Sequence, residues 1–171
     1  MYNILVQPVF SVVQKAFIIN SKWHVLITRL PQTGSAPVLY DLPGGRLEHQ
    51  EGLRGSLSER IMAQTGLTIT TVSAPLNVTT FLDWVDRSVQ VVRIIYLCLA
   101  QGQLTPGIPG TEYIWIEPAK HQLYPFPDEG YQQAFTNYLS HSELASSEFL
   151  GAGILTDTIT YLRTKSTSPL L

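Results

Sequence analysis

Apolar residues along this chain fall mostly into the short runs and alternations that are typical of β-strands. Runs rich in β-branched residues at 9–19 and 24–30 flank the turn signal Asn20-Ser21-Lys22, which predicts a β-hairpin. The apolar run at 88–99 is nearly continuous, so we expect it to form a central strand of a mixed sheet. Further strands are predicted at 67–72, 76–85 and 113–116.

Two other stretches have helical spacing. Residues 56–64 carry Leu57 and Ile61 on one stripe with Thr65 at its end, and Leu53 extends this stripe backwards by one turn. A second helix is predicted over 128–140, and its apolar side consists of Tyr131, Ala134, Phe135 and Tyr138. A hairpin, a helix, a sheet and a late helix in this order predict an α+β fold, built as an α/β/α sandwich around a mixed β-sheet.

Composition narrows the class of protein. The 171 residues are 44% hydrophobic and 14% charged, which favours a folded domain over disorder. A formal net charge of −2 gives no basic excess, so we expect no nucleic-acid partner. No leader and no membrane-spanning run are apparent, which predicts a protein with no membrane partner. The single Cys98 cannot form an internal disulfide, which predicts a cytoplasmic location. Because it lies in an apolar run, we expect its thiol to be buried and inert. The sparse charge also suggests that a second subunit covers some surface, and a homodimer is therefore expected.

Residues 42–67 carry the candidate chemistry. Gly44 and Gly45 follow a proline and allow the backbone to approach a ligand closely. Glu48 and Glu51 lie where this loop meets the predicted helix, and Gly66 is its C-terminal stop signal. A loop and helix that carry carboxylates are typical of a site for a divalent metal, and so for a phosphate substrate.

This segment resembles the Nudix box, whose pattern is G-x5-E-x7-R-E-U-x-E-E-x-G-U, where U is apolar. Aligned on Gly45, the pattern places Glu51, Ile61, Gly66 and Leu67 in register. The remaining four positions depart from it: Glu59 stands where the family has Arg, Arg60 where it has Glu, and Ala63 and Gln64 where it has a Glu pair.

The resemblance implies a Nudix-type sandwich and hydrolysis of a nucleoside-diphosphate-linked substrate with Mg²⁺ or Mn²⁺. Its residue roles carry over by position. The expected catalytic residues are Glu51, Glu59 and Glu112. The expected metal ligands are the Gly45 carbonyl, Glu48 and Glu59, at a box whose degenerate positions are Arg60, Ala63 and Gln64. The expected substrate-binding residues are Arg29, Gly44, Gly45 and Arg46.

The departures leave open how the charged side chains of the box are arranged. In the family the box Arg pairs with the first box Glu, whereas here Glu59 would face Glu51. Arg60 could cross over to relieve that repulsion, a metal could bridge the two carboxylates, or all three charges could be solvated. Asp83 and Asp86 could belong to a displaced metal site, although a turn role is favoured for both.

Two functions therefore remain open. One is a hydrolase with a rearranged metal site. The other is a catalytically silent Nudix fold that binds a nucleotide-type small molecule or a protein, because Ala63 supplies no ligand, Gln64 supplies only a neutral oxygen, and Arg60 would repel a cation. We expect a Nudix-like domain over 1–140 and a C-terminal extension over 141–171 that packs on this domain or on a partner subunit.

Overall fold

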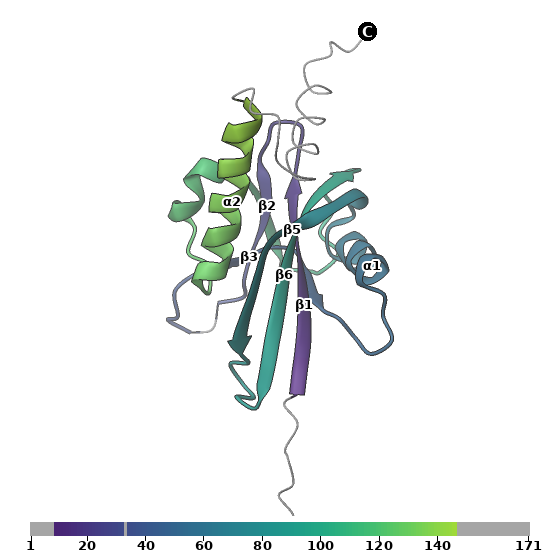
Figure 1. The fold of residues 1–171 in the computed structure, drawn as a ribbon, viewed down its shortest axis with the longest axis vertical. Coiled ribbons are helices and arrows are strands. Elements are labelled where there is room, and N and C mark those ends of the chain that lie inside the picture. Colours follow the sequence, from purple (N-terminus) through teal and green to yellow (C-terminus); the bar gives the residue numbers. More distant parts are fainter. Residues whose placement is uncertain (1–8, 33, 147–171) are drawn as a thin grey trace, which may run out of the picture.

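The computed structural model describes residues 9–32 and 34–146, and side chains as far as residue 141. It is a mixed sheet with one α-helix on each face (Figure 1). The neighbouring strands follow the order β3-β2-β1-β6-β5, while β4 pairs with β1 and β7 pairs with β2. The strands are β1 Val9–Ile19, β2 Val25–Arg29, β3 Tyr40–Asp41, β4 Gly44–Arg46, β5 Thr68–Leu82, β6 Val89–Gln101 and β7 Glu112–Ile116. The helices are α1 Leu53–Thr65, the 3₁₀ helix η1 Pro118–Leu123 and α2 Glu129–Ser146.

The predicted hairpin and central strand are both confirmed. β1 and β2 pair in antiparallel fashion across the turn at Asn20, whose side-chain oxygen accepts hydrogen bonds from the N–H groups of Lys22 and His24. β1 also runs parallel to β6 over its whole length, from Val9 opposite Val89 to Ile19 opposite Leu99. β6 lies between β1 and β5, as its apolar sequence predicted.

The predicted break between strands at 67–72 and 76–85 is wrong. The chain forms one long strand, β5, which pairs with β6 throughout but shifts register around Pro75. Proline has no N–H to donate to the ladder, so the strand accommodates it with a bulge and does not end there. β5 ends at Leu82, earlier than predicted, because the Asp83 carboxylate accepts hydrogen bonds from the N–H groups of Val85 and Asp86 and forms a turn.

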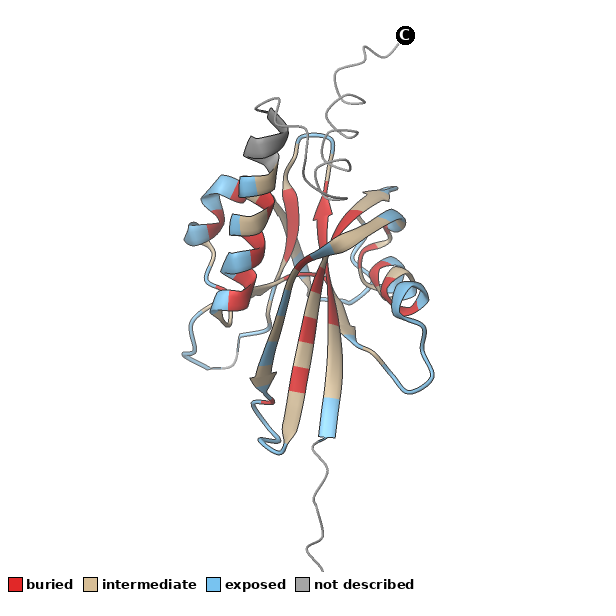
Figure 2. Ribbon diagram, viewed as in Figure 1, coloured by how far each residue is buried: buried red, intermediate tan, exposed pale blue. Residues whose placement is uncertain are grey.

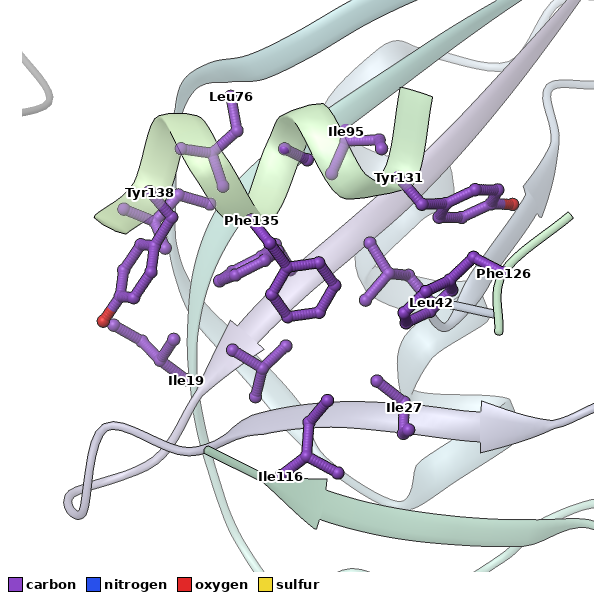
Figure 3. Close-up of a cluster of buried hydrophobic side chains, with 14 residues drawn as sticks. Ile19, Ile27, Leu42, Leu76, Ile95, Ile116, Phe126, Tyr131, Phe135 and Tyr138 are labelled. Atoms are coloured by element: carbon purple, nitrogen blue, oxygen red, sulfur yellow. The ribbon is translucent and has the colours of Figure 1, made fainter. Parts of the chain in front are cut away.

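Each helix covers its own hydrophobic cluster. On the α2 face, the four residues expected on the apolar side of the helix are all buried, and Figure 2 shows the buried side of α2 turned toward the sheet. Tyr131, Phe135 and Tyr138 point into the cluster drawn in Figure 3. The Phe17 and Phe135 rings meet edge to face at 4.8 Å. On the α1 face, Leu57 and Ile61 pack against Ala16, Ile18 and Leu26 of the sheet and against Cys98. Burial raises the pKa of Cys98 to about 12, in keeping with the expected inert thiol.

α1 begins three residues before the predicted helix, but its apolar stripe does not extend so far. Leu53 is 48% exposed, so the expected extension of the stripe is wrong. The first turn meets β1 through polar groups, since Gln14 Nε2 donates to the Leu53 carbonyl and Gln14 Oε1 accepts from the buried Ser56 hydroxyl. The predicted stop at Gly66 is confirmed, since this residue adopts a left-handed φ of 72° and donates its N–H to the Met62 carbonyl. The loop after β6 closes the helix end, where Thr105 and Gly107 donate N–H groups to the carbonyls of Thr65 and Gln64.

The second predicted helix continues past residue 140, as α2 ends at Ser146. The rest of the expected C-terminal extension, 147–171, lies outside the described residues. Among the helices that are described, none is long and apolar enough to cross a membrane.

Candidate functional site

The two glycines of the box form β4 beside the central strand β1. Gly44 lies opposite Lys15 and Gly45 lies opposite Gln14. Gly44 has a φ of 143°, and a Cβ atom at this position would collide with the Gln14 carbonyl oxygen. Glycine is therefore required at residue 44 by both conformation and space.

Gln64 binds the box loop through its whole amide. Its Nε2 donates to the Gly44 carbonyl at 2.8 Å, and its Oε1 accepts the Gly44 N–H at 3.0 Å. The family pattern has a glutamate here, but a carboxylate could not donate to that carbonyl. At this position the side chain ties the last turn of α1 to the loop.

Arg60 crosses to Glu51, which was one of the three arrangements left open by the sequence. Its Nη2 donates to Glu51 Oε2 at 3.0 Å, and the same oxygen accepts the Glu48 N–H at 2.8 Å. Glu59 is exposed on α1, and Arg60, the next residue, is the one that contacts Glu51. Arg60 therefore supplies, one residue later, the brace that the box Arg supplies in the family pattern.

The Arg60 side chain also lies directly against Gly45. A Cβ atom on residue 45 would stand 2.8 Å from Arg60 Cδ and 3.0 Å from Arg60 Nη1. The resemblance assigns the Gly45 carbonyl to a metal, so a fixed positive charge lies beside the expected metal position.

The residues present do not fit a divalent metal. Within the described part of the chain, no group of three or more His, Cys, Asp or Glu side chains is close enough to hold an ion. Glu48, Glu51 and Glu59 are thus not gathered into one ligand set. Mg²⁺ needs several oxygen ligands in near-octahedral geometry, and the degenerate positions offer a guanidinium, a methyl group and an amide that is already bound.

Arg29 and Glu112, predicted to bind substrate and to act in catalysis, are brought together. They are paired across β2 and β7, and Arg29 Nη1 contacts Glu112 Oε2 at 3.1 Å. Both side chains are about half exposed, at 41% and 54%. They line a hollow of about 440 Å³ together with residues 30–32 and 108–111.

A second hollow, of about 240 Å³, adjoins the first and reaches the box. Arg29 and Thr111 belong to both hollows, and Gly44 and Gln64 lie in the second. We call the two hollows together the box groove. It runs from the Arg29–Glu112 pair to the glycine turn.

Lys15 and Asp41 also line the box groove, and sequence reasoning missed both. Lys15 Nζ contacts Asp41 Oδ2 at 2.5 Å, while Asp41 Oδ1 accepts hydrogen bonds from the Leu42 N–H and from the hydroxyl of Tyr131 at 2.6 Å. Burial, together with the Asp41 charge, raises the pKa of Tyr131, which stays protonated as the donor. One signal was available: Lys15 is a lone charge within the apolar run of β1.

Arg46, also predicted to bind substrate, is held against the sheet. It donates to Ser11 Oγ at 2.8 Å and pairs with Asp83. Hydrogen bonds from the N–H groups of Asp86 and Val85, and then from Arg46, lower the pKa of Asp83. Hydrogen bonds from Ser88 lower the pKa of Asp86. The favoured turn role of both aspartates is confirmed.

No protein-family model matches the chain, and no curated protein matches it. Solved structures do. The E. coli ORF135 protein is 15% identical, with a TM-score of 0.67 over 84% of this chain and 96% of that one. The MutT protein from Methanosarcina mazei Go1 is 17% identical, with a TM-score of 0.66 over 81% and 99%. The MutT Nudix hydrolase from Burkholderia pseudomallei is 17% identical, with a TM-score of 0.60 over 73% and 95%. The sandwich predicted from the sequence is confirmed by these likenesses.

Proposed function

We propose that this chain, which has the Nudix fold, binds a nucleotide-type ligand in the box groove without metal-dependent hydrolysis. One observation carries the proposal: two of the positions where the family pattern has metal-binding glutamates, 60 and 64, hold side chains that are bound to the box loop itself. Gln64 is tied to Gly44, and Arg60 is tied to Glu51.

The groove supports binding of a ligand that has both phosphates and a polar base. Its charged groups are the donors Arg29 and Lys15 and the acceptors Asp41 and Glu112. A small number of polar groups within a partly apolar hollow is the usual make-up of a small-molecule site.

Hydrolysis with Mg²⁺ or Mn²⁺ is the second candidate, and what favours it is Glu51, which is in register with the family pattern and is held by the Glu48 N–H where the loop meets α1. For that function, Glu48, Glu59 and Glu112 would have to approach one another when metal binds. Glu112 would first have to leave Arg29. The two candidates therefore differ in whether the acidic residues gather.

Binding and turnover should be measured on the same sample. We expect members of a panel of nucleoside diphosphate derivatives to raise the melting temperature without product release in Mg²⁺, Mn²⁺ or EDTA. Metal-dependent turnover that is abolished by Glu51→Gln or Glu59→Gln would overturn the proposal in favour of hydrolysis. Arg54→Gln, an exposed change on the same helix, is the matched control.

A further inference from the structure

We infer that the Arg60 guanidinium is a built-in cation that holds a ligand phosphate at the Gly44–Gly45 turn, where the Nudix resemblance places a metal. The inference rests on the proposed function and states how the ligand is held. It implies that phosphate binding at this turn needs no divalent ion.

The Arg60 guanidinium lies beside the two glycines of the box. Arg60 lies against the Cα of Gly45, in space that a side chain on residue 45 would fill. Four residues further along α1, which is about one helical turn, Gln64 binds Gly44 and lines the box groove. The charge of Arg60 therefore stands beside Gly45, one residue along from Gly44, which lines the groove.

The Arg60 side chain is held in place but keeps N–H donors that can bind a ligand. Its Nη2 is fixed by Glu51 at 3.0 Å, and 26% of the side chain remains exposed. A guanidinium has five N–H donors in a planar fork, stays charged at all relevant pH values, and matches two oxygens of one phosphate group. Only the bond to Glu51 engages these donors among the described residues, so the others can meet a ligand.

Removing the charge of Glu51 should change the phosphate affinity in opposite directions for a guanidinium site and for a metal site. Its carboxylate partly neutralises Arg60, and so competes with a bound phosphate for the same charge. Glu51→Gln keeps an oxygen that can accept both the Glu48 N–H and Arg60, but removes the negative charge. A guanidinium site should then bind phosphate more tightly, whereas a site built on a Glu51-supported metal should bind it more weakly.

The experiment is calorimetric titration of the full chain with inorganic pyrophosphate and with ADP, each in EDTA and in Mg²⁺. We expect wild-type binding in EDTA, about tenfold weaker binding for Arg60→Gln, an intermediate affinity for Arg60→Lys, and several-fold tighter binding for Glu51→Gln. Arg54→Gln should match the wild type apart from a small, salt-screened change. Thermal unfolding of each variant checks that it is folded.

Three results would each overturn the inference and leave the proposed function intact. The first is wild-type binding that requires Mg²⁺. The second is an Arg60→Gln variant that is folded and binds as well as Arg54→Gln, and the third is a folded Glu51→Gln variant that binds no more tightly than the wild type. If neither pyrophosphate, ADP nor any member of the nucleotide panel binds the folded wild type with or without metal, the proposed function itself fails, and the inference with it.

Discussion

The side-chain amide of Gln64 pairs with both backbone groups of Gly44, donating to the carbonyl oxygen and accepting from the N–H. This joins the C-terminal turn of α1 to the first residue of β4, twenty positions earlier in the chain. An amide is suited to the task because it carries a donor and an acceptor side by side. A residue that the family pattern reserves for metal binding thus stabilises the fold.

Gln64→Glu should therefore destabilise the protein, although it restores the family residue. The ionised carboxylate cannot donate to the Gly44 carbonyl and would bring a negative charge close to that oxygen. We expect a loss of about 1–3 kcal/mol in the free energy of unfolding at neutral pH, measured by urea denaturation. Gln132→Glu, on the exposed side of α2, is the control and should change stability by less than about 0.5 kcal/mol. Equal effects at both positions would contradict the role of the amide.

Two glycines of the segment predict opposite effects of alanine. Gly44 has a φ of 143° and no room for a Cβ, so Gly44→Ala should lower stability by on the order of 3 kcal/mol or more. Gly55 is exposed within α1 and has nothing within 4 Å of its Cβ position, so Gly55→Ala should raise stability by about 0.5–1 kcal/mol. The comparison is made by thermal and urea unfolding of both variants. A stable Gly44→Ala protein would mean that β4 does not pair with β1 as described.

The register of the box and the two helix stripes could be predicted because each depends on spacing along the chain alone. Leu57 with Ile61, and Tyr131 with Phe135, are four apart and share a helix face wherever the helix lies. The partners of Lys15 and Arg60 could not be predicted in this way. Lys15 meets Asp41 only because β3 adds to β2 and the next strand, β4, adds to β1. The rotation of α1 decides whether residue 59 or 60 faces Glu51, and a difference of one residue reverses the charge of the contact.

The Arg93–Asp128 pair predicts how stability depends on pH. Two Arg93 nitrogens donate to the Asp128 carboxylate at 2.5 and 2.8 Å, and the Arg93 side chain is only 3% exposed. Burial alone would raise the pKa of Asp128, but the hydrogen bonds and charge of Arg93, with the Gly130 N–H, outweigh it and lower this pKa. A lowered carboxyl pKa contributes stability that is present above its unfolded value, near pH 4, and is lost as the pH falls through the native value.

Asp128→Asn removes this contribution and leaves the Arg93 charge buried without its partner. We expect the variant to be on the order of 3 kcal/mol less stable than the wild type at pH 7, and the difference to shrink as the pH falls below about 4. Urea denaturation at several pH values measures both quantities. A difference that is as large at about pH 2.5 as at pH 7 would mean that the loss comes from packing and not from the ion pair.

Restoring all four departures together tests whether the box is placed as the alignment requires. Glu59→Arg, Arg60→Glu, Ala63→Glu and Gln64→Glu would exchange the built-in charge for carboxylates on the face of α1 beside Gly45. We expect the quadruple variant to be less stable than the wild type in EDTA, because the bond between Gln64 and Gly44 is lost, and to recover stability in Mn²⁺, because carboxylates bring metal affinity to the site. The wild type should show no such rise. Calorimetric titration with Mn²⁺ would measure the new affinity directly. If the quadruple variant is folded but binds Mn²⁺ no better than the wild type, residues 60, 63 and 64 do not converge on one ion, even with the family's own ligands in place.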